Sequence, residues 1–202
     1  MPIKNLPVSR FETRVTRKVA EAILNFVGKI PTTTKHRAHD PAVAARNLAR
    51  AAATKAAVTS GSLALPPGPL GMLTLIPDLV AVWKIQAQLV ADIAAVYGQK
   101  AQLTKEQMLY CLFRHFASQA VRDLVVRAGE RVLIRSASLQ LLQTIAQKIG
   151  INVTKKFIGK SISRWIPVVG ALGVGAYAYF DTGQVAATAI ELFEREIQIE
   201  SQ

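Results

Sequence analysis

Acidic side chains, aromatic rings and cysteine are all scarce in this chain of 202 residues. Asp and Glu number 13 against 25 Lys and Arg, which gives a formal net charge of +12 at pH 7. This imbalance favours an anionic partner such as a phospholipid surface, a nucleic acid or an acidic protein. The single cysteine, Cys111, excludes an internal disulfide bond and fits a reducing compartment.

Strand-like alternation of apolar and polar residues is also missing. Hydrophobic residues make up 50% of the chain but aromatic residues only 6%, so most of the apolar content is Ala, Val, Leu and Ile. Apolar residues instead recur at helical spacing along most of the chain. We therefore predict an all-α fold, a single compact multi-helix domain of ordinary size.

No uninterrupted apolar run is long enough to suggest a signal sequence or a clean membrane span. Charged residues between Arg10 and Lys18 interrupt the N-terminal segment, so no secretory leader is evident and we expect a cytoplasmic protein. Two largely uncharged stretches are present: one from Ser60 to Val82, with no charge before Asp78, and one of 16 residues, Trp165 to Phe180. Prolines break the first, and the second is shorter than the roughly 20 residues that a spanning helix needs.

These two stretches have similar compositions, because each combines proline with closely spaced glycine. We expect them to pack against each other as adjacent elements of the domain. Asp78 and Asp181, each the first charged residue after a long uncharged run, are expected to cap a helix or to pair with a nearby arginine. The residues predicted to shape this packing are Pro67, Gly68, Gly71, Pro77, Asp78, Pro167, Gly170, Gly173, Gly175 and Asp181.

Several helix boundaries can be predicted from capping residues. Asp40-Pro41 and Pro77-Asp78 are typical helix starts, Thr104 with Gln107 forms a capping box, and Gly98 is a typical left-handed terminator. The helix after Thr104 is predicted to end near Gly129. Further helices are expected over 130–149, over 153–163 and over 182–197. Gly150 would stop the first of these three helices.

Two helices combine basic and apolar faces. The first extends from Ser9 to Gly28, and the second is the short helix over 153–163. Such helices lie on anionic membranes, or they pack on their own domain with the charges in water. The candidate membrane-contact residues are Arg10, Arg14, Arg17, Lys18, Lys155, Lys156, Lys160 and Arg164. Because residues 1–55 hold 11 basic and 3 acidic residues, we treat 1–55 as a basic helical region beside a core domain at 56–202.

Motifs with a chemical meaning are weak. Gly159-Lys160-Ser161 lacks the first glycine of a phosphate-binding loop, and G-x-x-G-x-G at Gly170 reverses the dinucleotide fingerprint. His36, His39 and Asp40 have too few partners for a metal site. Cys111 and His115 have helical i, i+4 spacing, but a catalytic pair also needs an orienting residue and an open pocket. We assign no catalytic residue, metal or cofactor and do not expect enzyme activity.

Residues 56–193 resemble the EcsC family. The resemblance rests on the proline–glycine break LPPGPLGMLTLIPDL, on the helix end IAAVYG at Ile93 to Gly98, and on the C-terminal run IPVVGALGVGAYAYFDTGQVAATAIELF. EcsC-type proteins are bacterial and are sometimes encoded beside transporter components. The resemblance implies membrane association and an accessory role in export, and it carries over no catalytic residue.

The sequence thus predicts a peripheral protein at the inner face of the cell membrane, bound to anionic lipid or to a membrane transport complex. One alternative is a membrane-inserting or pore-forming effector. A second is a carrier or enzyme for lipid or another apolar ligand, with its pocket between the two uncharged stretches. Neither a helix-turn-helix nor stacking aromatics among the basic residues is apparent, so we expect no specific nucleic-acid partner. A homo-oligomer remains open.

Overall fold

The fold consists of helices in two layers. The computed structural model describes residues 6–63, 75–128, 131–158, 167–194 and 199–200. Its elements are α1 (Leu6–Val27), α2 (Pro41–Leu63), α4 (Leu75–Val96), η1 (Lys100–Gln102), α5 (Lys105–Val121), η2 (Arg122–Leu124), β1 (Val125–Ala128), β2 (Arg131–Arg135), α6 (Leu139–Ile158), α7 (Pro167–Glu194) and β3 (Ile199–Glu200). The predicted all-α class is confirmed, with one small sheet in addition.

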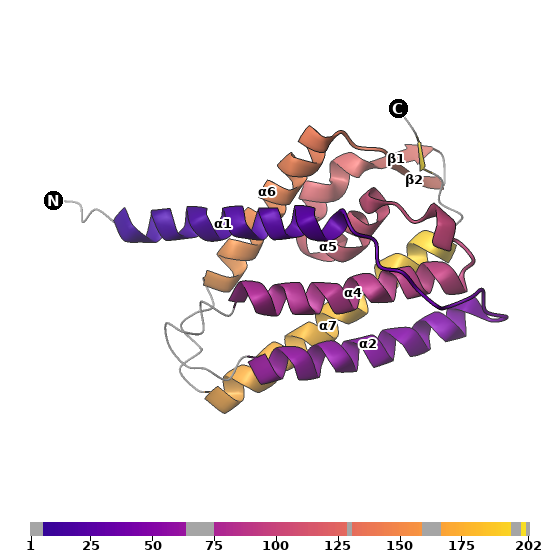
Figure 1. The fold of residues 1–202 in the computed structure, drawn as a ribbon, viewed down its shortest axis with the longest axis horizontal. Coiled ribbons are helices and arrows are strands. Elements are labelled where there is room, and N and C mark those ends of the chain that lie inside the picture. Colours follow the sequence, from indigo (N-terminus) through magenta and orange to yellow (C-terminus); the bar gives the residue numbers. More distant parts are fainter. Residues whose placement is uncertain (1–5, 64–74, 129–130, 159–166, 195–198, 201–202) are drawn as a thin grey trace.

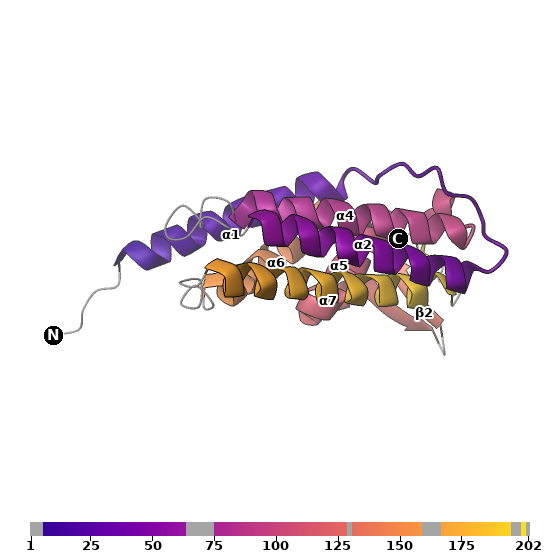
Figure 2. The same ribbon diagram turned by 90° about the horizontal axis from the view of Figure 1, so that it is seen from below.

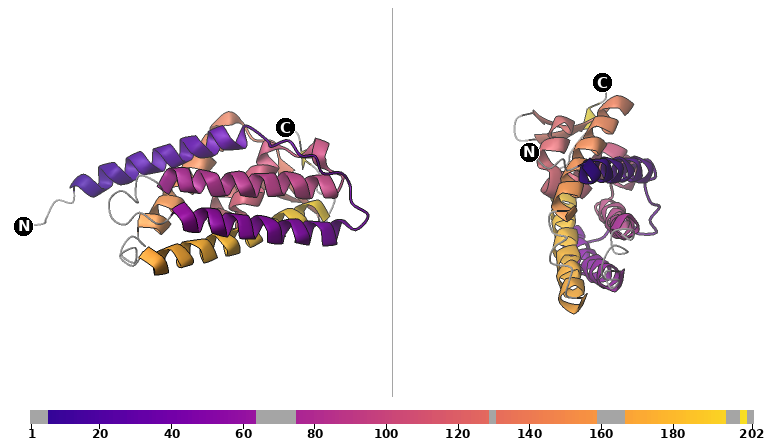
Figure 3. Two further views of the ribbon diagram at one scale, coloured as in Figure 1. Left: turned by 60° about the horizontal axis from the view of Figure 1, so that its bottom comes forward. Right: turned by 90° about the vertical axis from the view of Figure 1, so that its left-hand side faces the viewer.

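Helices α1, α4 and α2 form one layer, and α6, α5 and α7 form the other (Figures 1 and 2). Each layer packs on the other through α2 with α7, α1 with α6, and α4 with both α5 and α7. Looking along the helices, Figure 3 shows α4 between α1 and α2 in its layer. Because α4 has neighbours on both sides and beneath it, it is the most enclosed helix of its layer.

The core lies where α4 meets α5. Ile93 of α4 and Phe113 of α5 are fully or almost fully buried. The Trp83 ring meets the Phe113 ring edge to face, with centroids 5.4 Å apart. Edge-to-face contact suits the charge distribution of aromatic rings, so it adds specific orientation to the apolar burial.

The capping predictions are confirmed at three places. The Asp40 carboxylate accepts a hydrogen bond from the Val43 amide at 3.0 Å at the start of α2. Thr104 and Gln107 form a capping box at the start of α5. Gly98 has a φ of +80° just after α4, where only glycine is unstrained. Helix α4 begins at Leu75, two residues before the predicted start, and Pro77 lies in its first turn, where the missing N–H has no helical partner to lose.

Two boundary predictions in the second half of the chain are wrong. Helix α5 ends at Val121, not near Gly129, and residues 125–128 and 131–135 form the antiparallel strands β1 and β2, with Val125 opposite Ile134. The short strand β3 pairs in parallel with β2, giving the order β1-β2-β3. The sequence predicts helices over β1 and β2 because apolar runs of four or five residues do not distinguish the helical period from the strand period.

Helix α6 continues through Gly150, where the sequence predicts a stop. A β-carbon placed on Gly150 would lie 2.8 Å from the backbone oxygen of Thr16 in α1. The glycine therefore permits close approach of two helices and does not end one. Residues 167–194 also form one continuous helix, α7. The sequence instead predicts an apolar segment followed by a separate helix over 182–197.

Residues 1–55 are not separated from the remainder by a break in structure. The boundary at 55/56 falls inside α2, which is one helix from Pro41 to Leu63. Val19, Ile23 and Val27 of α1 belong to the same buried cluster as the residues of α4 and α5. The described part of the basic N-terminal region thus contributes to the main core.

Candidate functional site

The exposed side of α1 carries the basic residues that the sequence predicts for membrane contact. The side chains of Arg14, Arg17 and Lys18 are exposed, whereas Val19 and Ile23 are fully buried against the body. Arg17 and Glu21 form an ion pair of 3.8 Å in which both side chains are largely in water. Such an exposed ion pair contributes little free energy, so Arg17 remains available to an anionic partner.

A basic residue of α6, the helix that packs on α1, is exposed as well. The Thr16 hydroxyl donates to the Thr154 hydroxyl at 3.0 Å, which joins α1 to α6 across 138 residues of sequence. Lys155 follows Thr154 and is exposed. We call Arg14, Arg17, Lys18 and Lys155 the basic face.

The other candidates for membrane contact are described only in part. Arg10 belongs to α1 and Lys156 to α6, but their side chains are outside the described part of the structure, as are Lys160 and Arg164 entirely. The N-terminal end of α1 extends beyond the other helices (Figures 1 and 3). This end is therefore open to a partner on several sides.

The residues expected to shape the two uncharged stretches are only partly within the described structure. Pro67, Gly68 and Gly71 lie outside it, and the side chains of Asp78 and Pro167 and the surroundings of Gly170 are likewise not described. Val82 at the end of the first stretch and Ala178 in the second belong to one small buried cluster with Ala56 of α2. Gly175 is buried, but Gly173 and Pro77 are exposed.

A groove with a volume of about 490 Å³ lies between α1 and α4. Its apolar lining comes from Ala22 and Phe26 of α1, Val80 of α4 and Pro31 of the connector that follows α1. Its polar lining is Asn25, Lys29, Lys84 and Gln88. We call this the α1–α4 groove. It is not between the two uncharged stretches, where the sequence placed a pocket.

Both charged side chains of the α1–α4 groove are cationic. Lys29 and Lys84 are exposed, and neither forms an ion pair with any residue of the described ranges. Gln88 already donates to the Thr32 carbonyl at 3.1 Å and to the Asp92 carboxylate at 2.9 Å. The two lysines are thus available to an anion next to an apolar surface.

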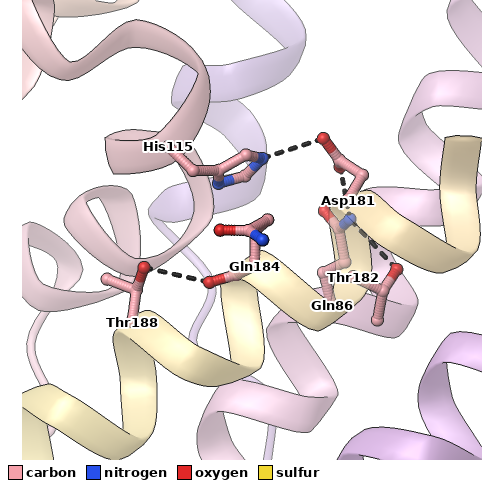
Figure 4. Close-up of polar contacts among 6 residues, drawn as sticks. All are labelled: Gln86, His115, Asp181, Thr182, Gln184 and Thr188. Carbon is pink, nitrogen blue, oxygen red and sulfur yellow. Dashed lines mark hydrogen bonds and ion pairs between the residues drawn. The ribbon is translucent and has the colours of Figure 1, made fainter.

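A second polar group lies in the interior, where α4, α5 and α7 meet (Figure 4). His115 Nε2 lies 2.8 Å from Asp181 Oδ1, and Gln86 Nε2 donates to Asp181 Oδ2, also at 2.8 Å. Gln86 donates in addition to the Thr182 hydroxyl at 3.2 Å, and the Tyr177 hydroxyl hydrogen-bonds Asp181. We call these five residues the Asp181 cluster.

The hydrogen bonds of the Asp181 cluster favour the ionised carboxylate. Burial alone would raise the pKa of Asp181, but hydrogen bonds from His115, Gln86 and Tyr177 and attraction to His115 lower it below its ordinary value. Burial and the neighbouring carboxylate raise the pKa of Tyr177, so its phenol keeps its proton. Asp181 therefore accepts hydrogen bonds in mid-helix and is not the helix cap that the sequence suggested.

Two atoms of the Asp181 cluster are buried without a hydrogen-bond partner, His115 Nδ1 and Gln86 Oε1. A general base needs a substrate within hydrogen-bond reach, and Nδ1 has almost no exposed surface. Cys111, which the sequence places within reach of His115, is fully buried, and burial raises the pKa of its thiol. The cluster as it stands joins three helices, and no reaction can be derived from it.

Sequence reasoning missed both the α1–α4 groove and the Asp181 cluster. Lys29 and Lys84 are far apart in sequence and line one groove only through packing, and His115 and Asp181 likewise come together only in the fold. The available signal was a solitary acidic residue, Asp181, in a long apolar segment.

Asp40 of the weak His36, His39, Asp40 pattern caps α2, and within the described ranges no three His, Cys, Asp or Glu side chains are grouped as a metal ion would require.

Within the part of the chain that the structure describes, one helical segment, Leu79–Val96 in α4, is long and apolar enough to cross a membrane by length and composition. Within the fold 61% of this segment is buried, and the core helix of a globular domain meets the same criterion. It is therefore a weak candidate for a span.

Comparison with known proteins gives one match. No curated protein and no solved structure is significantly similar to the chain. The sequence model of the EcsC protein family matches residues 13–196, which begins well before the resemblance at Ala56 and includes most of α1. Because this match extends over most of the chain, the protein belongs to the EcsC protein family.

Proposed function

We propose that this protein is a peripheral membrane protein that binds anionic lipid through the basic face of α1 and α6, at the inner surface of the bacterial cell membrane. The observation that carries the proposal is the exposure of Arg14, Arg17, Lys18 and Lys155 on adjoining helices. Arg14, Lys18 and Lys155 have no ion-pair partner among the described residues, and Arg17 has only a weak, exposed one.

The expected strength of this attachment follows from the number of charges. Each basic side chain near an anionic surface contributes about 1 kcal/mol. Four such residues would give about 4 kcal/mol, which corresponds to a dissociation constant on the order of 1 mM. Arg10 and Lys156, in the same helices, would strengthen binding if they also reach the membrane. The interaction is thus reversible and depends on salt.

The salt dependence is tested by sedimenting the purified protein with phosphatidylglycerol vesicles or with phosphatidylcholine vesicles. We expect binding to the anionic vesicles only, and release when ionic strength rises from about 0.1 M to about 1 M, since the screening length falls from about 10 Å to about 3 Å. Equal binding to neutral vesicles, or binding that persists at high salt, would contradict an electrostatic attachment. A vesicle-entrapped dye should stay inside, and its release would instead favour the membrane-inserting effector.

A further inference from the structure

We infer that the α1–α4 groove binds one anionic phospholipid, with an acyl chain against its apolar wall and the phosphate between Lys29 and Lys84. This inference deepens the proposed function and rests on it, because it names the lipid class that the membrane-bound protein would hold. The groove is a concave site, whereas the basic face is an open surface, and the two can therefore be tested separately.

The wall of the groove suits a hydrocarbon chain. Ala22 and Phe26 lie one turn apart on α1, and Val80 of α4 and Pro31 of the connector complete the apolar lining. All four are partly buried, so each still presents apolar surface to the groove. The volume of about 490 Å³ is in the range of roughly 300–1,000 Å³ typical of small-ligand sites. It is enough for a single chain and its head group.

The charges of the groove select an anion. Lys29 lies in the connector just after α1 and Lys84 in α4, and no acidic side chain contributes to the lining of the groove. Neither lysine is neutralised by an ion pair within the described residues. Lysine binds phosphate as a flexible point charge, so two of them can approach one phosphate from opposite sides. Asn25 adds an amide that can hydrogen-bond the glycerol.

The position of the groove favours a membrane lipid over a soluble phosphate. Lys18, Ala22 and Asn25 follow one another at spacings of four and three residues, which places them along one side of α1, and Lys29 follows just after the helix ends. The stripe begins in the basic face and ends in the groove. A lipid that meets the basic face at the membrane is therefore next to the groove entrance, and its chain has an apolar surface to contact there.

The test is calorimetric titration of the full chain with octanoyl lysophosphatidylglycerol below its micelle concentration. Octanoyl lysophosphatidylcholine provides the same chain without net charge, and glycerol phosphate provides the phosphate without a chain. We expect the anionic lysolipid to bind more tightly than either. Equal binding of the choline lipid would overturn the role of the lysines, and equal binding of glycerol phosphate would overturn the role of the apolar wall.

Two variants separate the two parts of the site. Lys29→Gln with Lys84→Gln should weaken binding of the anionic lysolipid about 25-fold, since each surface charge is equivalent to about a fivefold change. Ala22→Leu should weaken it by filling the groove while leaving both lysines in place. Arg46→Gln with Arg50→Gln, on the exposed side of α2, removes the same charge elsewhere and should leave the affinity unchanged. No binding by the wild type, or unchanged binding by both groove variants, would overturn the inference.

Vesicle sedimentation distinguishes failure of this inference from failure of the proposed function. If the wild type sediments with anionic vesicles in a salt-sensitive manner but does not bind the lysolipid, the groove inference alone is wrong. If it binds the lysolipid with the predicted loss in the groove variants but does not sediment with vesicles, the peripheral attachment is wrong and the lipid site stands. Both lysines are exposed, so their substitution should leave folding intact, which thermal unfolding would verify.

Discussion

At the scale of single residues, Asp181 connects three helices. It receives hydrogen bonds from Gln86 of α4 and from Tyr177 one turn earlier in α7, and it pairs with His115 of α5. Its side chain is 15% exposed, so these partners replace most of its contact with water. A buried carboxylate without hydrogen-bond partners would destabilise the fold, whereas a carboxylate that accepts several hydrogen bonds fixes how the helices meet.

Replacing Asp181 with Asn should lower the free energy of unfolding by about 1–3 kcal/mol near neutral pH, because the buried donors lose a charged acceptor. Since folding lowers the pKa of Asp181, its ionised form stabilises the protein above the unfolded-chain pKa of about 4. That contribution is lost as the pH falls through the folded-state pKa. Urea unfolding at a series of pH values should therefore show the difference between wild type and variant shrinking below about pH 4.

The control for this prediction is Asp123→Asn. Asp123 pairs with Lys148 at 3.5 Å, but both side chains are nearly half exposed. Exposed ion pairs contribute about 0–1 kcal/mol, so this substitution should have a small effect. If Asp181→Asn and Asp123→Asn had equal effects, or if the effect of the first stayed constant into acid, the stabilising role of the ionised Asp181 would be wrong.

At the scale of elements, the crossing of α1 and α6 depends on Gly150. The backbone oxygen of Thr16 would be 2.8 Å from a β-carbon at this position, and Thr16 also hydrogen-bonds Thr154 one turn later in α6. Two helices can approach this closely only where one of them has no side chain. This crossing sets the position of the basic face relative to the core.

Gly150→Ala should therefore destabilise the protein, by up to about 2 kcal/mol. Alanine favours a helix over glycine by about 1 kcal/mol, but overpacking against a backbone costs about 1–3 kcal/mol. Gly183→Ala in α7 is the matched control, because nothing lies within 4 Å of its added β-carbon, and it should stabilise by up to about 1 kcal/mol. Thermal unfolding of both variants measures the difference. A Gly150→Ala protein as stable as Gly183→Ala would contradict the close approach.

Helix ends that depend on residues a few positions away were predicted well from the sequence. The caps at Asp40 and Thr104 and the terminator at Gly98 join a side chain or backbone to residues a few positions away, so sequence alone revealed them. Gly150 looked like a helix end because its reason to be glycine, the contact with Thr16, comes from another helix. The β1–β2 hairpin was missed because its short apolar strands also fit a helical period.

At the scale of the whole molecule, positive charge and apolar surface adjoin each other on α1. The amphipathic pattern predicted which residues of α1 are exposed and which are buried, and the structure agrees at Arg14, Arg17, Lys18, Val19 and Ile23. The α1–α4 groove could not be predicted in this way, because Lys29 and Lys84 line a common groove only when α1 and α4 pack side by side. The EcsC family match extends over both helices, so the groove lies within the matched region.

The proposal that the basic face of α1 attaches the protein to membranes is tested most directly by two variants of equal charge. Arg14→Gln, Arg17→Gln and Lys18→Gln together remove three charges from the face, and Arg46→Gln, Arg50→Gln and Lys55→Gln remove three exposed charges from α2. In sedimentation with phosphatidylglycerol vesicles, the α1 variant should bind about a hundredfold more weakly than the wild type, since three surface charges are equivalent to about 3 kcal/mol. The α2 variant should bind nearly as the wild type does. Equal loss in the two variants would show that net charge alone drives binding and would contradict a specific role for α1.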